Sequence, residues 1–366
     1  MTQFPARQGI PPGVVTLADH EQHARTQLDD NAWAYFSGGA ADEISLRANR
    51  SAWDALPLWP RVLRPLAGGH TRVTLAFQRL AHPDGELALA YAAAALGAGV
   101  VLSTQASVPL EKVAQAVLPD PGRGPLWFQL YLQPDRGFTE ALVQRAESAG
   151  YEALVLTVDA PTSGVRDRER RAGFRLPAGV GAVNLAGLRA PAPSALSPGQ
   201  SALFDGLLHH APTWEDIAWL RSITRLPVLL KGVLHPADAR QAVSLGAAGL
   251  IVSNHGGRTL DTAPATATAL PGVAQAVGGA VPVLVDGGIQ RGTDVLKAMA
   301  LGASAVLVGR PAVWGLANAG AAGVAHVLRL LRDELEVAMA LTGCATLADA
   351  TSALLDGQQV APSRSV

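Results

Sequence analysis

The chain has 366 residues, 49% of them apolar, and a formal net charge of −1 at pH 7. This near-neutral charge gives no basic face for nucleic acid, and no apolar run reaches the length of a membrane span. The single cysteine, Cys344, excludes an intramolecular disulfide, and the N-terminus lacks a basic-then-apolar secretory signal, so we expect a cytoplasmic protein.

Residues 1–70 differ in pattern from the rest of the chain. They contain a helical stretch, Leu17–Gly38, followed by a Trp- and Pro-rich region that reaches Pro65. Because strands and helices do not alternate here, we predict an N-terminal extension that covers the main domain.

From residue 71 to residue 345, short apolar runs alternate with helix-like segments such as Phe138–Ala149, Pro236–Leu245 and Asp294–Leu301. The runs are rich in Val, Leu and Ile, as buried parallel strands are. The seven clear runs are Val100–Ser103, Trp127–Tyr131, Leu154–Asp159, Pro227–Lys231, Gly249–Ser253, Pro282–Asp286 and Ala305–Gly309. Repeated βα units in a chain of this length predict a (β/α)8 TIM barrel, within a single domain that spans residues 1–366.

Two segments depart from this alternation. The first strand would have to be Val73–Phe77, which is atypically short, and a barrel that lacks a full strand exposes two unpaired edges. Residues 178–212, rich in Ala, Pro, Ser and Gly, follow the fourth strand when Val73–Phe77 is counted as the first. A loop of this length at the catalytic face of a barrel predicts a lid.

The most informative motif is Ser253-Asn254-His255-Gly256-Gly257-Arg258, which directly follows an apolar strand. It presents an imidazole, two glycines and a guanidinium at the carboxyl end of that strand, where barrels bind their ligands. In isolation such a motif fits a plain strand–turn with a surface histidine equally well. The residues at the neighbouring strand ends therefore determine which interpretation is favoured.

The last two strands end in Asp286–Gly292 and Gly309–Pro311. Glycine-rich turns with Arg310 beside them predict a phosphate site, because the loops after the last two strands usually bind phosphate in barrels. Lys231 could reach the ring system of such a ligand as a point charge. Neutral hydrogen-bonding groups come from neighbouring strand ends, namely Ser103, Gln129 and Thr157.

The reactive groups lie at other strand ends. His255 is the natural general base, and Asp159 could hold its imidazole and favour the protonated form. Arg258 and Arg166 offer guanidinium groups to a carboxylate, and Tyr131 can donate to a developing oxyanion. This set suits proton or hydride removal next to a carboxylate. The nine histidines form no HxxxH or HxH pair, so we expect no metal site.

Taken in chain order, FQLY, LTVDAP, LPVLLKG, SNHGGRTLD, VDGGIQRGTDVLKA and LGASAVLVGRP resemble the FMN-dependent L-2-hydroxy-acid oxidases and dehydrogenases. That family includes glycolate oxidase, lactate oxidase and mandelate-oxidising enzymes. The resemblance extends from about Tyr35 to Cys344. It implies FMN as cofactor, a small 2-hydroxy acid as substrate, and a homo-oligomer of four or more subunits.

The resemblance also implies roles for single residues. His255 would take the substrate's α-proton, or its hydroxyl proton if hydride is transferred, with Asp159 as its partner. The substrate would contact Arg258, Arg166 and Tyr35, with Tyr131 near its hydroxyl. Lys231 would lie beside the flavin N1–C2 carbonyl. The remaining cofactor positions would be Ala76, Ser103, Gln129, Thr157, Ser253, Asp286, Gly288, Gly309 and Arg310.

Three features depart from the family pattern. The segment Thr71–Pro83 is shorter, so much of the first strand and its turn toward the flavin is absent. Gln105 stands where glycolate-oxidising members often carry tryptophan, which argues mildly against glycolate. Gln290 replaces an arginine that is common in the phosphate turn.

The expected function is therefore oxidation of a lactate-like or mandelate-like L-2-hydroxy acid, with O₂ reduced to H₂O₂. A soluble dehydrogenase with another electron acceptor would share every catalytic residue. Another FMN barrel, such as a type 2 isopentenyl diphosphate isomerase, would not need His255, Arg258 and Asp159 together. A non-catalytic barrel that has lost flavin through its short first strand is the remaining alternative.

Overall fold

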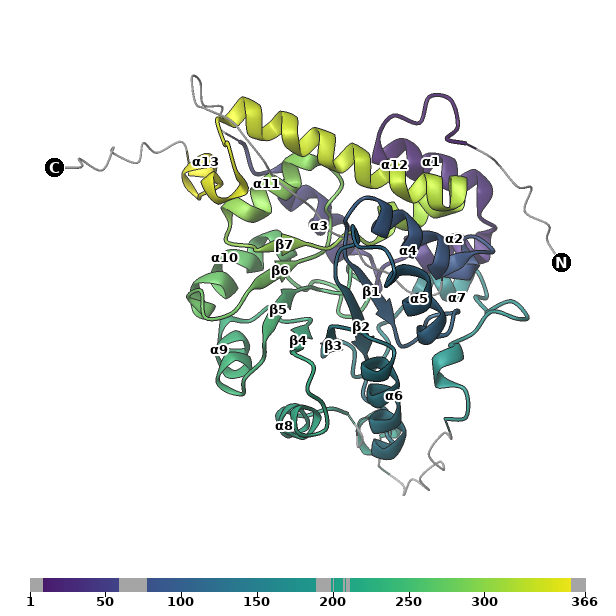
Figure 1. The fold of residues 1–366 in the computed structure, drawn as a ribbon. Coiled ribbons are helices and arrows are strands. Elements are labelled where there is room, and N and C mark those ends of the chain that lie inside the picture. The colour runs from purple at the N-terminus through teal and green to yellow at the C-terminus, as the bar shows by residue number, and fades with distance from the viewer. Residues whose placement is uncertain are drawn as a thin grey trace.

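The computed structural model describes residues 9–58, 78–188, 199, 201–206, 208 and 211–356. Its centre is one sheet of seven parallel strands in the order β1-β2-β3-β4-β5-β6-β7 (Figure 1). The strands are β1 (Val100–Ser103), β2 (Leu126–Leu130), β3 (Ala153–Thr157), β4 (Val228–Lys231), β5 (Gly249–Val252), β6 (Val283–Val285) and β7 (Ala305–Val306). The seven predicted runs are thus all strands, and each is hydrogen-bonded to its sequence neighbour, which confirms a parallel sheet of βα units.

Side chains of the strands alternate between two apolar layers. On the inner face, Val101 and Val155 pack in one cluster with Leu307. On the outer face, Leu154 and Leu156 join the cluster that contains the surrounding helices. Val101 belongs to β1 and Leu307 directly follows β7, so the two ends of the sheet curl around a shared interior.

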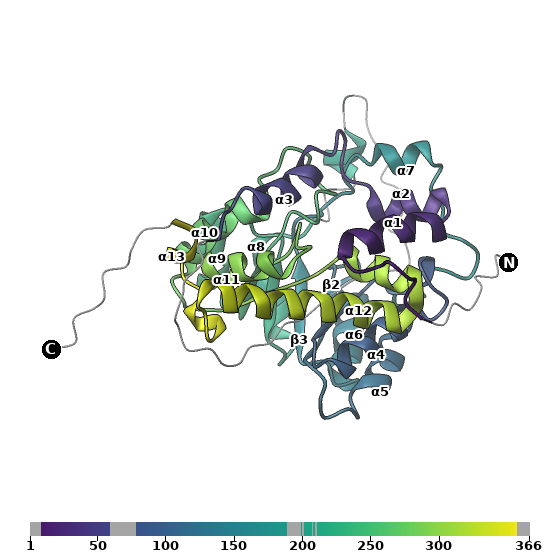
Figure 2. The same cartoon turned by 90° about the horizontal axis from the view of Figure 1, so that it is seen from above.

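Helices cover the outer face of the sheet. The predicted helices are confirmed as α6 (Arg136–Ser148), α9 (Pro236–Ser244) and α11 (Gly292–Ala300). The others around the sheet are α4 (Gly85–Ala95), α5 (Leu110–Val117), α8 (Trp214–Ser222), α10 (Thr266–Val277), α12 (Arg310–Thr342) and the short α13 (Ala353–Asp356). Helix α12 has non-helical backbone angles at Ala319 and Gly320, and it lies along α4 and the N-terminal α1 (Leu17–Gln27) (Figures 1 and 2).

The predicted helical stretch Leu17–Gly38 is two helices, α1 and α2 (Asp30–Ser37). The break has a local cause, because Leu28 is extended and the Asp29 side chain accepts a hydrogen bond from the backbone N–H of Ala32 at 2.7 Å. A third helix, α3 (Ile44–Asp54), follows and contacts α10. Helix α2 contacts α7 (Asp167–Arg171), which places the extension beside the segment that follows β3.

The proposed first strand, Val73–Phe77, lies outside the described residues, and Ala76 with it. The strand order therefore ends at β1 on one side and at β7 on the other. Gln78, which begins the 3-10 turn η1 (Gln78–Leu80), is buried, and its side-chain amide has no hydrogen-bond partner within the described part of the chain.

The long loop at residues 178–212 is described in part. It contains the 3-10 turn η2 (Val183–Leu185) and the π-helical turn η3 (Ala202–Gly206). Asn184 fixes its start, because its side-chain oxygen accepts a hydrogen bond from the backbone N–H of Leu110 at 3.0 Å. Its role as a lid stays a prediction. None of the described helices is long and apolar enough to cross a membrane.

Candidate functional site

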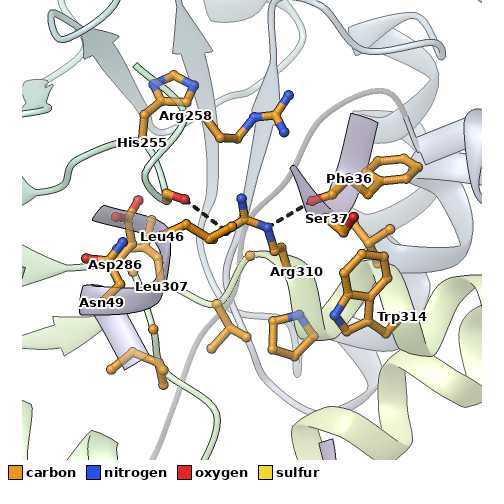
Figure 3. Close-up of a pocket in the computed structure, with 18 of the residues that line it drawn as sticks. Phe36, Ser37, Leu46, Asn49, His255, Arg258, Asp286, Leu307, Arg310 and Trp314 are labelled. Carbon is orange, nitrogen blue, oxygen red and sulfur yellow. Dashed lines mark hydrogen bonds between the residues drawn. The ribbon is translucent and has the colours of Figure 1, made fainter. Parts of the chain in front are cut away.

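A cavity of about 610 Å³ lies at the carboxyl ends of the strands, between the strand ends, the N-terminal extension and the start of α12. Figure 3 shows Arg310 in its middle, with His255 and Arg258 on one side and Trp314 nearby. The predicted site residues that line it are Tyr35, Ser103, Gln129, Tyr131, Thr157, Lys231, His255, Arg258, Asp286, Gly288, Gly309 and Arg310. Sequence reasoning thus brought together residues from both ends of the chain.

His255 has a left-handed backbone, with φ of 57°, just after β5. Its ring Nδ1 lies 2.9 Å from Asp159 Oδ1. A carboxylate accepts hydrogen bonds, so this contact assigns the proton to Nδ1 and leaves the lone pair of Nε2 free to act as a base. Nε2 lies 3.5 Å from the Tyr131 hydroxyl, toward the cavity. Gly232 is required beside this pair, because a Cβ there would overlap the Asp159 side chain.

The pKa values of this pair favour a neutral imidazole beside a carboxylate. Burial lowers the pKa of His255, and the hydrogen bond to Asp159 offsets only part of that effect. Burial would raise the pKa of Asp159, but the hydrogen bond with His255 and the charge of Lys231 outweigh it and lower that pKa. The hydrogen bond from His255 to Asp159 therefore stabilises the protonated imidazole, but burial outweighs this effect.

Arg258 is held by backbone oxygens at the C-terminal end of α2. Its Nη1 donates to the backbone oxygen of Tyr35 and, at 2.9 Å, to that of Gly38. Its Nη2 donates to Glu169 Oε1 at 2.9 Å. The guanidinium carbon of Arg258 lies 4.9 Å from the centroid of the Tyr35 ring, so the ring and the cation together line one part of the cavity.

Tyr131 directly follows β2, and Lys231 is the last residue of β4, two strands further along the sheet. Burial raises the pKa of Tyr131 to about 12, so its phenol keeps its proton and can donate. Lys231 Nζ lies 2.8 Å from Ser253 Oγ and 3.1 Å from Asp286 Oδ2. Burial would lower the pKa of Lys231, but Asp286 and Asp159 outweigh it and raise that pKa, so the ammonium stays charged.

Three neutral side chains form a short hydrogen-bonded row across β1, β2 and β3. Ser103 Oγ donates to Gln129 Oε1 at 2.8 Å, and Gln129 Nε2 donates to Thr157 Oγ1 at 2.9 Å. The register of the sheet sets this row, since Ser103 pairs with Gln129 across β1 and β2. The row fixes which atoms remain to face a ligand.

In the middle of the cavity, Arg310 donates three hydrogen bonds to backbone oxygens, those of Phe36 at 2.8 Å (Figure 3), Gly256 at 3.0 Å and Gly38 at 2.9 Å. Burial acts to lower the pKa of Arg310, and the repulsion from Arg258 adds to it. A guanidinium stays charged in proteins, so this buried cation favours an anion in the cavity.

The turn after β6 is built against α3. Trp53 Nε1 donates to the backbone oxygen of Gly287 at 2.8 Å, and Arg50 Nη1 donates to that of Gly288 at 2.7 Å. Gly288 has φ of 78°, and a Cβ there would overlap the backbone of Asn49. Asp294 accepts from the backbone N–H groups of Gln290 and Arg291, at 3.0 and 2.9 Å, so the protein itself already uses these two donors.

Known proteins have a similar sequence and a similar fold. A profile described as FMN-dependent dehydrogenase matches residues 24–357. The chain is 52% identical over 357 residues to an L-lactate oxidase from Roseobacter sp. (strain GAI101), covering 94% of this chain and 95% of that protein. It is 44% identical over 353 residues to glycolate oxidase 1 of Zea mays, covering 92% and 94%. A crystal structure of mandelate oxidase with (S)-2-phenylpropionate superposes with a TM-score of 0.80 at 44% identity, covering 92% and 96%.

The chain belongs to the FMN-dependent dehydrogenase family. The expected family and the expected cofactor, FMN, are thereby confirmed. The side chains that line the cavity also fit FMN. The cavity joins a buried cation, Arg310, which forms no salt bridge within the described part of the chain, to a charged ammonium, Lys231. Asp286 also lines the cavity, and its Oδ1 is buried without a hydrogen-bond partner in the described residues, as an acceptor for a sugar-like hydroxyl would be.

Three of the predicted site residues do not line the cavity but lie next to residues that do. Asp159 contacts His255, and Ser253 contacts Lys231. Arg166 does not line the cavity, and its Nη1 lies 3.5 Å from Glu169 Oε1. Sequence reasoning missed Glu169 altogether. Only its place three residues after Arg166, one helical turn away, could have indicated this contact.

Proposed function

We propose that this protein oxidises an L-2-hydroxy acid to the 2-oxo acid and passes the two electrons to O₂, forming H₂O₂. One observation carries the proposal: the His255–Asp159 pair opens onto the same cavity as Arg258 and the charged Lys231. A base beside a carboxylate-binding cation suits a 2-hydroxy acid, whose reacting carbon is bonded to the carboxylate. The named activities of the L-lactate oxidase and glycolate oxidase relatives support the same reaction.

We assign the following roles to residues of this chain. Arg258 and Tyr35 bind the substrate carboxylate, and Arg166 adds positive charge from behind. Tyr131 donates a hydrogen bond to the substrate oxygen. His255 Nε2 takes one proton, from the α-carbon or from the hydroxyl when hydride leaves the carbon. FMN, when bound, supplies the two-electron acceptor.

The positions that would hold FMN follow the same cavity. Gly288, Gly309 and Arg310 would hold the phosphate, and Asp286 a ribityl hydroxyl. Lys231 would contact the ring system. Ser103, Gln129 and Thr157 would offer hydrogen bonds along it, with Ser253 fixing Lys231 and Ala76 completing the contact from the first strand.

L-Lactate is the first substrate to test, with L-mandelate second and glycolate third. Two relatives besides the Roseobacter protein are also named L-lactate oxidase, at 49% and 48% identity. The 44% identity to mandelate oxidase supports the larger substrate. Gln105 in place of a tryptophan argues against glycolate as the preferred acid.

The decisive measurement is the visible absorbance spectrum of the purified protein under anaerobic conditions. Flavin bands that bleach on addition of L-lactate or L-mandelate, with H₂O₂ formed stoichiometrically once air is admitted, support the proposal. Bleaching that O₂ does not reverse would favour a dehydrogenase with another acceptor. A protein that remains colourless after FMN is supplied would contradict the proposal.

We further propose that the protein is a cytoplasmic homo-oligomer of four or more subunits. Each subunit would consist of an N-terminal extension at 1–70 and a barrel at 71–345 with a lid at 178–212. The family resemblance and the single cysteine support this proposal. Light scattering coupled to size exclusion gives the subunit number directly, and a monomeric mass would contradict it.

A further inference from the structure

The segment that contains α7 is joined to α2 by several contacts. The rings of Tyr35 and Phe174 stack, with centroids 4.7 Å apart and planes at 15°. Arg168 Nη1 donates to Ser37 Oγ at 2.9 Å. These contacts hold α7 against the wall of the cavity that carries Arg258, so a side chain on the inner face of α7 has a fixed position relative to that guanidinium.

Glu169 is that side chain. Its Oε1 accepts from Arg258 Nη2 at 2.9 Å and from Arg166 Nη1 at 3.5 Å. The Glu169 and Arg258 side chains are each only 14% exposed, so solvent screens their attraction poorly. Arg258 lines the cavity, whereas Glu169 and Arg166 do not. Glu169 therefore approaches the guanidinium from behind and leaves the cavity side of Arg258 to a ligand.

The contact also fixes the charge of the site. Arg258, Arg166 and Glu169 together carry a single net positive charge, which matches the single carboxylate of a simple 2-hydroxy acid. Arg310, another guanidinium that lines the cavity, is left to the proposed phosphate. Without Glu169 the same place would carry two positive charges, and a ligand with two carboxylates would gain about twice as much attraction from the change as a ligand with one.

We propose that Glu169 is a positioning residue that holds Arg258 and sets the anion site to one net positive charge, so that monocarboxylates are favoured over dicarboxylates. The inference rests on the proposed function in one respect, that Arg258 receives the substrate carboxylate. It adds the residue that tunes this site and the ligand property that the residue selects.

Two substitutions separate charge from reach. Glu169→Gln keeps a side-chain oxygen that accepts from Arg258 but removes the charge. Glu169→Asp keeps the charge but shortens the side chain by one methylene. Asp167→Asn is the matched control, because it removes the same charge from the same helix at a residue whose partner, Arg170, has a 70% exposed side chain.

The test measures binding of pyruvate and oxalate to the FMN-loaded protein by isothermal titration calorimetry. The two anions have nearly the same shape, but oxalate carries one more negative charge. For Glu169→Gln we expect the ratio Kd(pyruvate)/Kd(oxalate) to rise about tenfold, since one uncompensated charge acts on the extra carboxylate at short range. Asp167→Asn should leave the ratio within about twofold of the unmodified protein, as exposed charges are screened.

Glu169→Asp should weaken both anions alike and slow flavin reduction, with the ratio unchanged, because the charge stays while the contact with Arg258 is lost. Equal weakening of both anions in Glu169→Gln would overturn the charge role and leave a structural contact. Calorimetry needs no turnover, so a shifted ratio in a protein that does not oxidise L-lactate would sustain the inference while the proposed function fails. Turnover with an unshifted ratio would do the reverse, and a protein that binds neither anion would contradict both.

Discussion

Replacement of Asp159 by asparagine tests whether the hydrogen bond from His255 to Asp159 supports His255 as the base. The Asp159 and His255 side chains are 10% and 22% exposed, so their 2.9 Å hydrogen bond is poorly screened by solvent. A hydrogen bond to a charged group contributes about 1.5–3 kcal/mol, which corresponds to a rate loss of about 10- to 150-fold if it stabilises the imidazolium formed in the reaction. The substitution is nearly isosteric, so the close approach of Gly232 is kept.

A second effect acts in the same direction. An asparagine whose NH₂ group faces His255 Nδ1 would place the imidazole proton on Nε2, and the base would be lost. Loss of the carboxylate also removes the influence that raises the pKa of His255, so burial would lower that pKa further. Both effects slow proton removal, and neither touches a residue on the cavity surface that binds FMN.

The assay is anaerobic stopped-flow bleaching of the flavin at saturating L-lactate. The FMN content of the variant, read from its visible spectrum, is the control, because Asp159 does not line the cavity and Asp286 still pairs with Lys231 in the variant. A bleaching rate within threefold of the unmodified protein, with FMN bound, would refute the assignment of Asp159 as the support of the base.

Other substitutions probe the cofactor end, the turn and the pH response. Lys231→Met should slow flavin reduction at least tenfold by stopped flow, since an ammonium near the flavin favours its anionic reduced form; an unchanged rate would argue against that contact. Arg310→Met should raise the Kd for FMN about 10- to 100-fold in a fluorescence titration, because a buried phosphate would lose its cation, and an unchanged Kd would contradict the phosphate assignment. Gly288→Ala should lower the unfolding temperature and the FMN content, whereas Gly181→Ala, which meets nothing within 4 Å, should change neither. The lowered pKa of His255 predicts that kcat/KM for L-lactate falls only on the acid side, below the usual imidazole range, as the base becomes protonated; a fall that begins above neutral pH would contradict this.

The strand ends were predictable because a parallel sheet brings them to one edge. Each of the seven apolar runs identified a strand, and the polar residue after it then had to lie near the others. His255, Lys231 and Asp286 come from three consecutive strand ends and line one cavity for that reason. Their positions directly after apolar runs were therefore enough to predict that they lie close together.

The supports of the site were not predictable in this way. Glu169 lies in Asp167–Arg171, a run of charged residues that reads as a solvated helix surface. Arg50 belongs to α3, yet it reaches Asp294 Oδ2 at 2.5 Å and the backbone of the turn after β6. Such contacts join segments far apart in the chain and depend on how helices dock, which local patterns do not encode. The first strand also stayed beyond reach, since Val73–Phe77 lies outside the described residues.

The N-terminal extension contacts both arginines to which the site's anion-binding roles are assigned, Arg258 and Arg310. The backbone oxygen of Gly38 accepts a hydrogen bond from Arg258 and another from Arg310, each at 2.9 Å. Both cations thus sit at the C-terminal end of α2, where the helix dipole attracts positive charge. One of them faces the proposed substrate carboxylate and the other the proposed phosphate. A change that displaces α2 should therefore weaken both binding steps together, whereas a change at a single strand end should weaken one. The extension is accordingly a part of the site itself, since it binds Arg258 and Arg310 through the carbonyl of Gly38 that they share and through those of Tyr35 and Phe36.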